Sequence, residues 1–149
     1  MSTGEEVDPR CLESFGRQGM MQLLGAQLIA AGDGRAVIEV PYRPDLTQQN
    51  GYFHGGVVAA IADTASGYAA YTTMPADSSV LTVEFKINLV NPAAGDRLRA
   101  EAKVHKAGRT LVVVGATVAA IRGEREVTCA EMLGTFLVVA NTRDVEPRR

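Results

Sequence analysis

The feature of this sequence that most restricts its fold is a set of long alternating segments in the second half of the chain. From residue 79 onward, apolar and polar residues alternate with the period of two that is typical of β-strands. Short turns, marked by Ala107-Gly108 and by Gly123, separate these segments. Strands joined by such short turns pair antiparallel. The sequence therefore predicts an antiparallel sheet whose strands occupy residues 79–92, 97–106, 111–121 and 126–139.

Two of these strands indicate how the sheet is covered. The strand predicted at 111–121 is apolar on both faces, and such a strand must be covered on both sides. A single helix covers only one side, so we expect a second subunit on the other. The strand at 79–92 alternates instead: one face carries Val83, Phe85, Ile87 and Leu89, and the other carries Thr82, Glu84, Lys86 and Asn88.

The first half of the chain is predicted to contain two helices and a hairpin. Residues 55–72 form the main helix, and the turn Gly32-Asp33-Gly34 divides 26–43 into two strands. A long polar connection, residues 41–53, joins the hairpin to the main helix. This order predicts the α+β class, with one antiparallel sheet and a helix on one face. The other helix is predicted over 9–25 from the helical spacing of Leu12, Phe15, Met20, Leu23 and Leu24 before Gly25.

Composition indicates an ordinary globular protein. The 149 residues are 46% hydrophobic and 21% charged, and they carry a net charge of −2. We expect a single domain over 1–149, with an ordered core of about 9–140 between charged ends at 1–8 and 141–149. The net charge does not favour nucleic acid, and no segment has the roughly 20 apolar residues of a membrane span. With no signal peptide, and with Cys11 and Cys129 as structural thiols, a soluble cytoplasmic protein is expected.

The main helix has an aspartate among small residues. At about 100° per residue, Asp63 shares a face with small residues, and the bulky face opposite is expected to lie on the sheet. Burial alone would raise the pKa of this carboxyl group. Two interpretations stay open. In the first, Asp63 has a structural place only, either solvated or bonded to a hydroxyl such as that of Ser66. In the second, it is the acid of a functional site. The small face holds Gly56, Ala59, Ala60, Ser66, Gly67 and Ala70, and the bulky face holds Val57, Val58, Ile61, Ala65 and Tyr68.

The start of this helix carries a second candidate feature, His54-Gly55-Gly56. Glycines leave the free N–H groups of a helix start open to a ligand, and the helix dipole favours an oxyanion or a polarised carbonyl there. The alternative is a plain helix start with His54 as a cap or a core residue. Helical geometry separates His54 from Asp63 by roughly 13 Å, on opposite sides of the helix. If both serve one site, the acid must come from another copy of the chain in a two-fold dimer.

Together these residues resemble the hotdog-fold acyl-CoA thioesterases of the phenylacetate-pathway (PaaI-like) type and their 4-hydroxybenzoyl-CoA thioesterase relatives. The resemblance covers residues 20–140 and rests on a polar amide, an HGG sequence and an acid nine residues after the histidine. A strand that ends at Pro92, with Thr82 ten residues earlier, also fits. The resemblance implies a sheet wrapped around a long central helix. It also implies a homodimer with two sites at its interface, or a tetramer built as a dimer of dimers.

The resemblance further implies a role for each site residue. The Gly55 N–H donates to the thioester carbonyl, and Asp63 of the partner acts as base for water or as nucleophile forming an anhydride. Gln48 orients the water or the carbonyl, His54 holds the loop and helps to position the thioester, and Thr82 helps to place water near Asp63. The implied reaction hydrolyses an acyl- or aryl-CoA to the free acid and coenzyme A. It needs no metal and no cofactor, because coenzyme A is part of the substrate.

The amide position mixes two patterns within this resemblance. Phenylacetate-type members often have Asn there and 4-hydroxybenzoyl-type relatives have Gln, whereas this chain has Gln48 with Asn50 two residues later. Asn50 and Gly56 are therefore further candidates for substrate binding. For the phosphates of coenzyme A, Arg109 is the best single candidate among the nearby cations, although these cations also suit the solvated outer face of a sheet. They are Lys86, Arg97, Arg99, Lys103, Lys106 and Arg109.

Two other functions are compatible with the same fold. Some hotdog hydratases and dehydratases use a His and a Glu fourteen residues apart, but the residue fourteen after His54 is Tyr68. A non-catalytic acyl-CoA-binding module is the other alternative, against which Asp63 argues. The sequence does not define whether the acyl group is aryl, medium-chain or long-chain.

Overall fold

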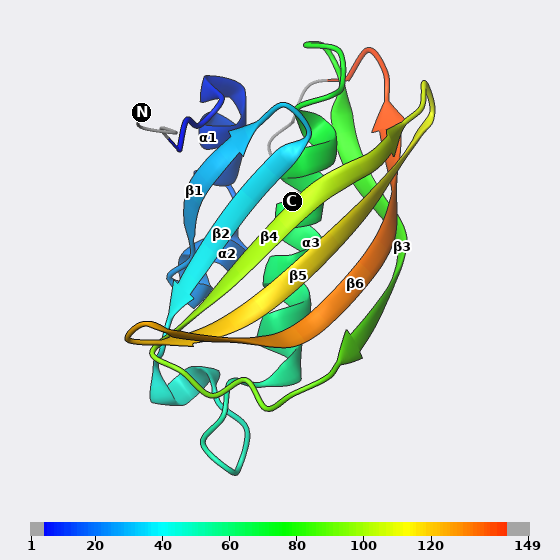
Figure 1. Ribbon diagram of the computed structural model, residues 1–149. Helices are drawn as coiled ribbons and strands as arrows, with labels where there is room; N and C mark the ends of the chain where they lie inside the picture. Colours follow the sequence, from blue (N-terminus) through cyan, green and yellow to red (C-terminus); the bar gives the residue numbers. More distant parts are fainter. Residues whose placement is uncertain (1–4, 143–149) are drawn as a thin grey trace.

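A six-stranded antiparallel sheet curves around one long helix (Figure 1). The protein is described by a computed structural model covering residues 5–142. Across the sheet the strands follow the order β1-β2-β4-β5-β6-β3. The predicted α+β class and the sheet wrapped around a central helix are confirmed. The elements are α1 (Pro9–Phe15), α2 (Gly19–Leu24), β1 (Gln27–Gly32), β2 (Arg35–Pro41), the 3₁₀ helix η1 (Pro44–Leu46), α3 (Gly55–Tyr71), β3 (Ser79–Leu89), β4 (Arg97–Ala107), β5 (Leu111–Arg122) and β6 (Arg125–Val139).

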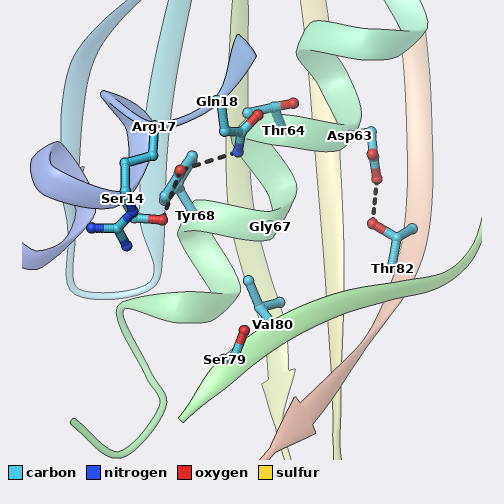
Figure 2. A pocket seen from close by; sticks show the side chains of 10 residues that line it. All are labelled: Ser14, Arg17, Gln18, Asp63, Thr64, Gly67, Tyr68, Ser79, Val80 and Thr82. Atoms are coloured by element: carbon cyan, nitrogen blue, oxygen red, sulfur yellow. Dashed lines mark hydrogen bonds between the residues drawn. The ribbon is translucent and has the colours of Figure 1, made fainter. Parts of the chain in front are cut away.

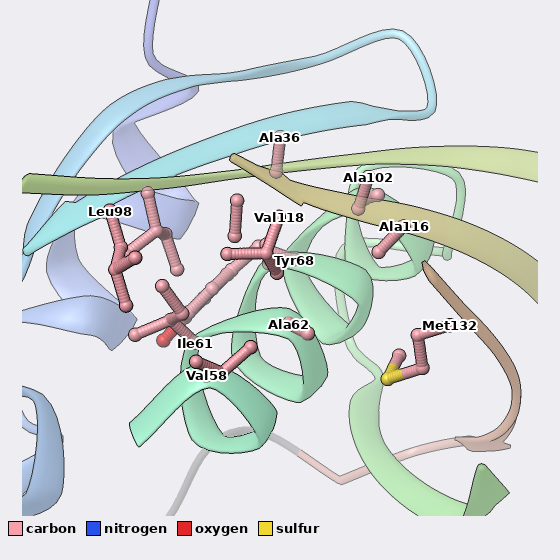
Figure 3. Packing of buried hydrophobic residues seen from close by; sticks show 14 of the residues in the cluster. Ala36, Val58, Ile61, Ala62, Tyr68, Leu98, Ala102, Ala116, Val118 and Met132 are labelled. Atoms are coloured by element: carbon pink, nitrogen blue, oxygen red, sulfur yellow. The ribbon is translucent and has the colours of Figure 1, made fainter. Parts of the chain in front are cut away.

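The core lies between α3 and the inner face of the sheet. Figure 3 shows Val58, Ile61 and Ala62 of α3 packed with Leu98 of β4 and Val118 of β5, and all five are at most 1% exposed. Burial of such side chains stabilises the fold by about 1.5–3 kcal/mol for each large one. The bulky face of α3 therefore lies on the sheet, as predicted.

The small face of α3 is narrower than the helical spacing predicts. Ser66 and Ala70, expected on that face, are fully buried, because the curved sheet covers more than one side of the helix. Asp63 and Gly67 remain partly exposed. The hydroxyl of Ser66 has no hydrogen-bond partner among the described residues, so Ser66 is not the partner of Asp63.

The helix predicted over 9–25 is wrong as a single element. It breaks after Phe15, and α2 begins only at Gly19 before Gly25 ends it in the left-handed conformation, with φ 68°. The helical spacing that predicted one helix runs across two separate helices. The apolar residues of the two parts therefore do not share one face. Leu12, Met20 and Leu23 are consequently 55%, 54% and 68% exposed. Leu24 is buried in agreement with the predicted pattern, while Cys11 and Met21, outside that pattern, also fill the core.

The two edges of the sheet differ. Residues 5–8, predicted within a frayed end, instead cover part of the β1 edge: the Asp8 N–H donates to the Ala31 carbonyl at 2.8 Å, and the Ala31 N–H donates to the Glu6 carbonyl at 3.1 Å. Asp8 then caps α1. No described residue of this chain pairs with the outer edge of β3, although the strand carries exposed apolar side chains. These are Leu81, Val83, Phe85 and Leu89, which are 58%, 54%, 38% and 56% exposed.

A β-bulge in β3 corrects the predicted alternation of that strand. Thr82 pairs with Phe136 of β6 and Glu84 with Thr135, so Val83 is the extra residue between them. Residues before and after a bulge exchange faces relative to a simple alternation. Thr82 therefore points toward α3, on the same side of the sheet as Phe85, and not with Glu84 as the sequence predicts. This bulge brings Thr82 to the site described next.

Candidate active site

Asp63 and Thr82 form the first half of the candidate site. The Thr82 hydroxyl donates a hydrogen bond to Oδ1 of Asp63 at 2.8 Å (Figure 2). Burial raises the pKa of the Asp63 carboxyl group above its ordinary value, and the Thr82 hydrogen bond opposes this rise by stabilising the carboxylate. A half-buried acid with a raised pKa in a pocket is typical of a general base.

The pocket beside Asp63 runs along the small face of α3. It has a volume of about 460 Å³, and the residues lining it come from α1, α3, β3 and the turn before α2. Gly67, one helical turn after Asp63, has no side chain to fill it. The lining residues are Ser14, Arg17, Gln18, Asp63, Thr64, Gly67, Tyr68, Ser79, Val80 and Thr82.

The start of α3 forms the second half. His54 caps the helix: its Nδ1 accepts a hydrogen bond from the Gly56 N–H at 2.8 Å. A Cβ on residue 56 would lie 2.9 Å from that nitrogen, so Gly56 leaves room for the imidazole. The cap interpretation of His54 is therefore confirmed. The Gly55 N–H donates to no acceptor among the described residues, and it lies at the positive end of the helix dipole.

Gly55 lines a second pocket, of about 440 Å³, whose walls are mostly apolar. Gln48 lies in this pocket, and its side-chain oxygen accepts a hydrogen bond from the Asn50 N–H. Asn50 is exposed and outside it. The His54 ring faces a different recess, beside Leu23 and Arg43. The structure thus brings Gln48 and Gly55 together, and leaves Asn50 and His54 at the periphery.

The two halves are separate within one chain. The pocket at Asp63 and the pocket at Gly55 share no lining residue. Strand β3 passes both, since Thr82 lines the first and Leu89 the second. The geometric expectation that His54-Gly55 and Asp63 cannot meet in one chain agrees with this arrangement.

The predicted phosphate-binding cations do not gather at either half. Arg99 donates to Glu39 at 2.8 Å and to Glu5 at 2.8 Å, and Arg97 lies 3.5 Å from Glu39, so these two form ion pairs on the outer face of the sheet. The interpretation as an outer face fits both. Arg109 is exposed in the turn between β4 and β5 and lines neither pocket. Its role stays a prediction.

The sequence did not indicate one cluster in the Asp63 pocket, formed by Ser14, Gln18 and Tyr68. Gln18 Nε2 donates to the Tyr68 hydroxyl at 3.1 Å, and Ser14 Oγ lies 3.1 Å from the same oxygen. Tyr68 lies 54 positions after Ser14 and 50 after Gln18 in the chain, so no local spacing could predict the contact. Two further observations concern the whole described chain. None of its helices is long and apolar enough to cross a membrane, and none of its His, Cys, Asp and Glu residues gather as metal ligands would.

Comparison with known proteins extends this description. The pattern of the thioesterase superfamily matches residues 50–127, which include Gly55, Asp63 and Thr82. A solved thioesterase family protein from Silicibacter pomeroyi is 43% identical, covers 88% of this chain and 96% of its own, and superposes with a TM-score of 0.86. The 1,4-dihydroxy-2-naphthoyl-CoA hydrolase of Listeria monocytogenes is 28% identical over 52% of this chain and 63% of its own.

The PaaI protein from the phenylacetic acid degradation operon of Escherichia coli shares the fold at 21% identity. Its TM-score is 0.79, with 92% of this chain and 99% of that chain covered. The hotdog fold is thereby confirmed. From the family match and the similarity to the Silicibacter protein together, the chain belongs to the thioesterase superfamily and is a thioester hydrolase.

Proposed function

We propose that the protein hydrolyses acyl-CoA thioesters at a site shared between two copies of the chain. The observation that carries this proposal is the Asp63–Thr82 pair: a half-buried carboxylate held in place by a hydroxyl, with its pKa raised, beside an open pocket. Thioesters are already activated, so a positioned base and one carbonyl-polarising donor are sufficient equipment. The relative from Listeria monocytogenes, named as a CoA hydrolase, supports the same substrate class.

In the proposed reaction, the Gly55 N–H of one protomer donates to the carbonyl oxygen of the thioester. Asp63 of the partner removes a proton from water as the water oxygen attacks the carbonyl carbon. The tetrahedral intermediate then collapses, the C–S bond breaks, and coenzyme A leaves as the thiolate, which takes up a proton. Alternatively, the carboxylate attacks directly, and water hydrolyses the resulting anhydride. Gln48 orients the carbonyl or the water, and no cofactor takes part.

The proposed dimer pairs β3 with β3 of the partner. The β3 edge is bare and apolar, which is the kind of edge that pairs with another strand. Antiparallel pairing about a two-fold axis at Lys86 would set Thr82 of one copy opposite Leu89 of the other, because the bulged Val83 takes no place in the pairing. Because Thr82 lies at Asp63 and Leu89 lies at Gly55, this register would join the two halves of the site. A tetramer would be two such dimers.

The alternatives have less support. The residue that would have to be the acid of a hydratase is Tyr68, whose hydroxyl is bonded to Gln18 in the core end of the pocket. A binding module without activity would have no use for an acid with a raised pKa, and the experiment below decides between the two functions.

The test is release of free thiol from a broad panel of acyl- and aryl-CoAs by the wild type and by Asp63→Asn. The wild type is expected to hydrolyse at least one class. Asp63→Asn should lower kcat by about 10²–10⁴, since a general base contributes roughly this much, with little change in KM. Thiol release from no member of the panel would refute the thioesterase proposal in favour of a binding module. Full activity of Asp63→Asn would refute the assignment of the base.

A further inference from the structure

The Asp63 pocket contains a polar end that thioester hydrolysis does not itself require. Ser14 and Gln18 both contact the Tyr68 hydroxyl, at 3.1 Å each, and all three residues line the pocket. Tyr68 is only 3% exposed, and the other two are half-buried. A polar cluster at this depth is costly unless its hydrogen bonds are satisfied, and these contacts hold its atoms in fixed positions. The pocket therefore presents an ordered hydrogen-bonding surface.

An open path connects this surface to Asp63. Figure 2 shows the Asp63–Thr82 pair at one end of the pocket, the cluster at the other, and the turn of α3 that carries Gly67 between them. Among the described residues, a Cβ at residue 67 would come near Cε1 of Phe136 alone, at 3.9 Å. Along the helix axis, the five residues from Asp63 to Tyr68 span roughly 7.5 Å. An acyl group of about this length would reach from the reacting carbon to the cluster.

Resting on the proposed function, we propose that this pocket receives the acyl group and selects acyl groups that carry an oxygen acceptor at the end far from the thioester. Ser14, Gln18 and Tyr68 are then specificity-determining residues. The Gln18 amide has a second N–H besides the one that it donates to the Tyr68 hydroxyl, and it can donate this N–H to an incoming oxygen. A purely apolar chain of the same length would remove this N–H from water without accepting its hydrogen bond, which disfavours that substrate.

Two kinds of acyl group share this chemistry, those ending in a hydroxyl and those ending in a carboxylate. Arg17, at the mouth of the same pocket, bears on the choice. Its guanidinium lies 3.1 Å from Glu13, and the two side chains are 42% and 78% exposed, so the ion pair is a surface pair of small energy. A terminal carboxylate could take the place of Glu13, whereas a hydroxyl would use the buried cluster alone.

The experiment compares kcat/KM for three substrates of equal chain length: hexanoyl-CoA, 6-hydroxyhexanoyl-CoA and adipoyl-CoA. The wild type is expected to prefer at least one polar substrate over hexanoyl-CoA by about tenfold or more. Gln18→Leu and Tyr68→Phe should reduce that ratio to within about threefold of unity. Gln22→Leu is the matched control, because Gln22 is exposed on α2, which begins directly after Gln18, and donates to the Gly16 carbonyl outside the pocket. Its ratio should equal that of the wild type.

The ratio separates specificity from folding, since the amount of folded enzyme affects both substrates equally. Arg17→Gln distinguishes the two sources: it should lower the ratio for adipoyl-CoA alone if the carboxylate is the natural end group. Equal kcat/KM on all three substrates, or a ratio unchanged in both Gln18→Leu and Tyr68→Phe, would overturn this inference and leave the thioesterase proposal intact. No thiol release from any acyl-CoA would instead overturn the proposed function itself.

Discussion

The pockets at Asp63 and at Gly55 lie on the same helix but supply opposite kinds of chemistry. The Asp63 pocket is lined by hydroxyls, an amide and a carboxylate, so its chemistry resides in side chains. The Gly55 pocket is mostly apolar, with Tyr52, Phe53, Val58 and Leu89 among its walls, and the group that we propose to act there is a backbone N–H. One half is therefore sensitive to the identity of a side chain, and the other to the presence of a single backbone hydrogen.

After that of Asp63→Asn, the largest expected effect tests the backbone half. Gly55 is the first residue of α3, a position where proline is well tolerated, and His54 before it has the extended ψ of 139° that proline demands. Gly55→Pro removes the N–H and adds a ring, and the loss of the N–H should lower kcat by about 10²–10³, the usual contribution of one oxyanion donor. Gly55→Ala keeps the N–H and is the control: its Cβ would meet Cδ1 of Leu89 at 2.9 Å, a flexible side-chain end. Equal losses in both variants would mean that steric fit, and not the N–H, matters here.

Mixing subunits tests whether the two halves belong to different chains. A heterodimer of Gly55→Pro and Asp63→Asn subunits would hold one site with both groups intact and one with neither. Random exchange should therefore restore about a quarter of the wild-type activity from two nearly inactive proteins. Thiol release after mixing, with subunit exchange verified by mass, is the measurement. Activity that stays at the sum of the two variants would place both halves in one chain.

A smaller effect is expected from Thr82. Its hydrogen bond lowers the pKa of Asp63 and so opposes the rise caused by burial. Thr82→Val removes that bond, so the pKa of Asp63 should rise further, and the acidic limb of the kcat–pH profile should move to higher pH. Activity at neutral pH should fall by about tenfold. Thr82→Ser keeps the hydroxyl and should retain the wild-type profile, and a profile identical in Thr82→Val would show that the bond does not tune the base.

The smallest expected effect concerns stability. Gly67 lies within α3 with room for a methyl group, and alanine in a helix is more favourable than glycine by roughly 0.5–1 kcal/mol. Gly67→Ala should therefore raise the free energy of unfolding by about that amount in urea titration. The added methyl group should also narrow the pocket, which disfavours longer acyl groups. Ala59→Gly, on the same face but outside the pocket, should lower it by a similar amount. A destabilised Gly67→Ala would mean that something approaches this glycine closely, for example the partner chain.

Much of the fold was predictable because its signals are local. Each strand of the second half has its own alternation, and the turns at Asp33-Gly34 and Gly123 use left-handed backbone that few residues adopt. The helix start and Asp63 were identified for the same reason, since both lie within one periodic segment. The separation of the two halves followed from helical geometry alone.

The rest depended on contacts between distant segments. The break between α1 and α2 changes which apolar residues are buried. The helical spacing of the apolar residues in 9–25 does not indicate where this break lies. The bulge at Val83 places Thr82 beside Asp63, although simple alternation assigns Thr82 to the opposite face. Only the resemblance to a family linked Thr82 to that acid. The cluster around the Tyr68 hydroxyl arises where α1 and α2 dock on α3, which no pattern within either segment encodes.

The partly covered β1 edge limits the number of copies of the chain that can join by strand pairing. In the proposed dimer, strand pairing uses the β3 edge of each copy, while residues 6–8 already cover part of the opposite edge, at Ala31 of β1. Such an assembly terminates at two members, whereas two free borders would permit an open-ended ribbon. Residues 6–8 therefore disfavour growth of the proposed dimer into a longer assembly through the β1 edge.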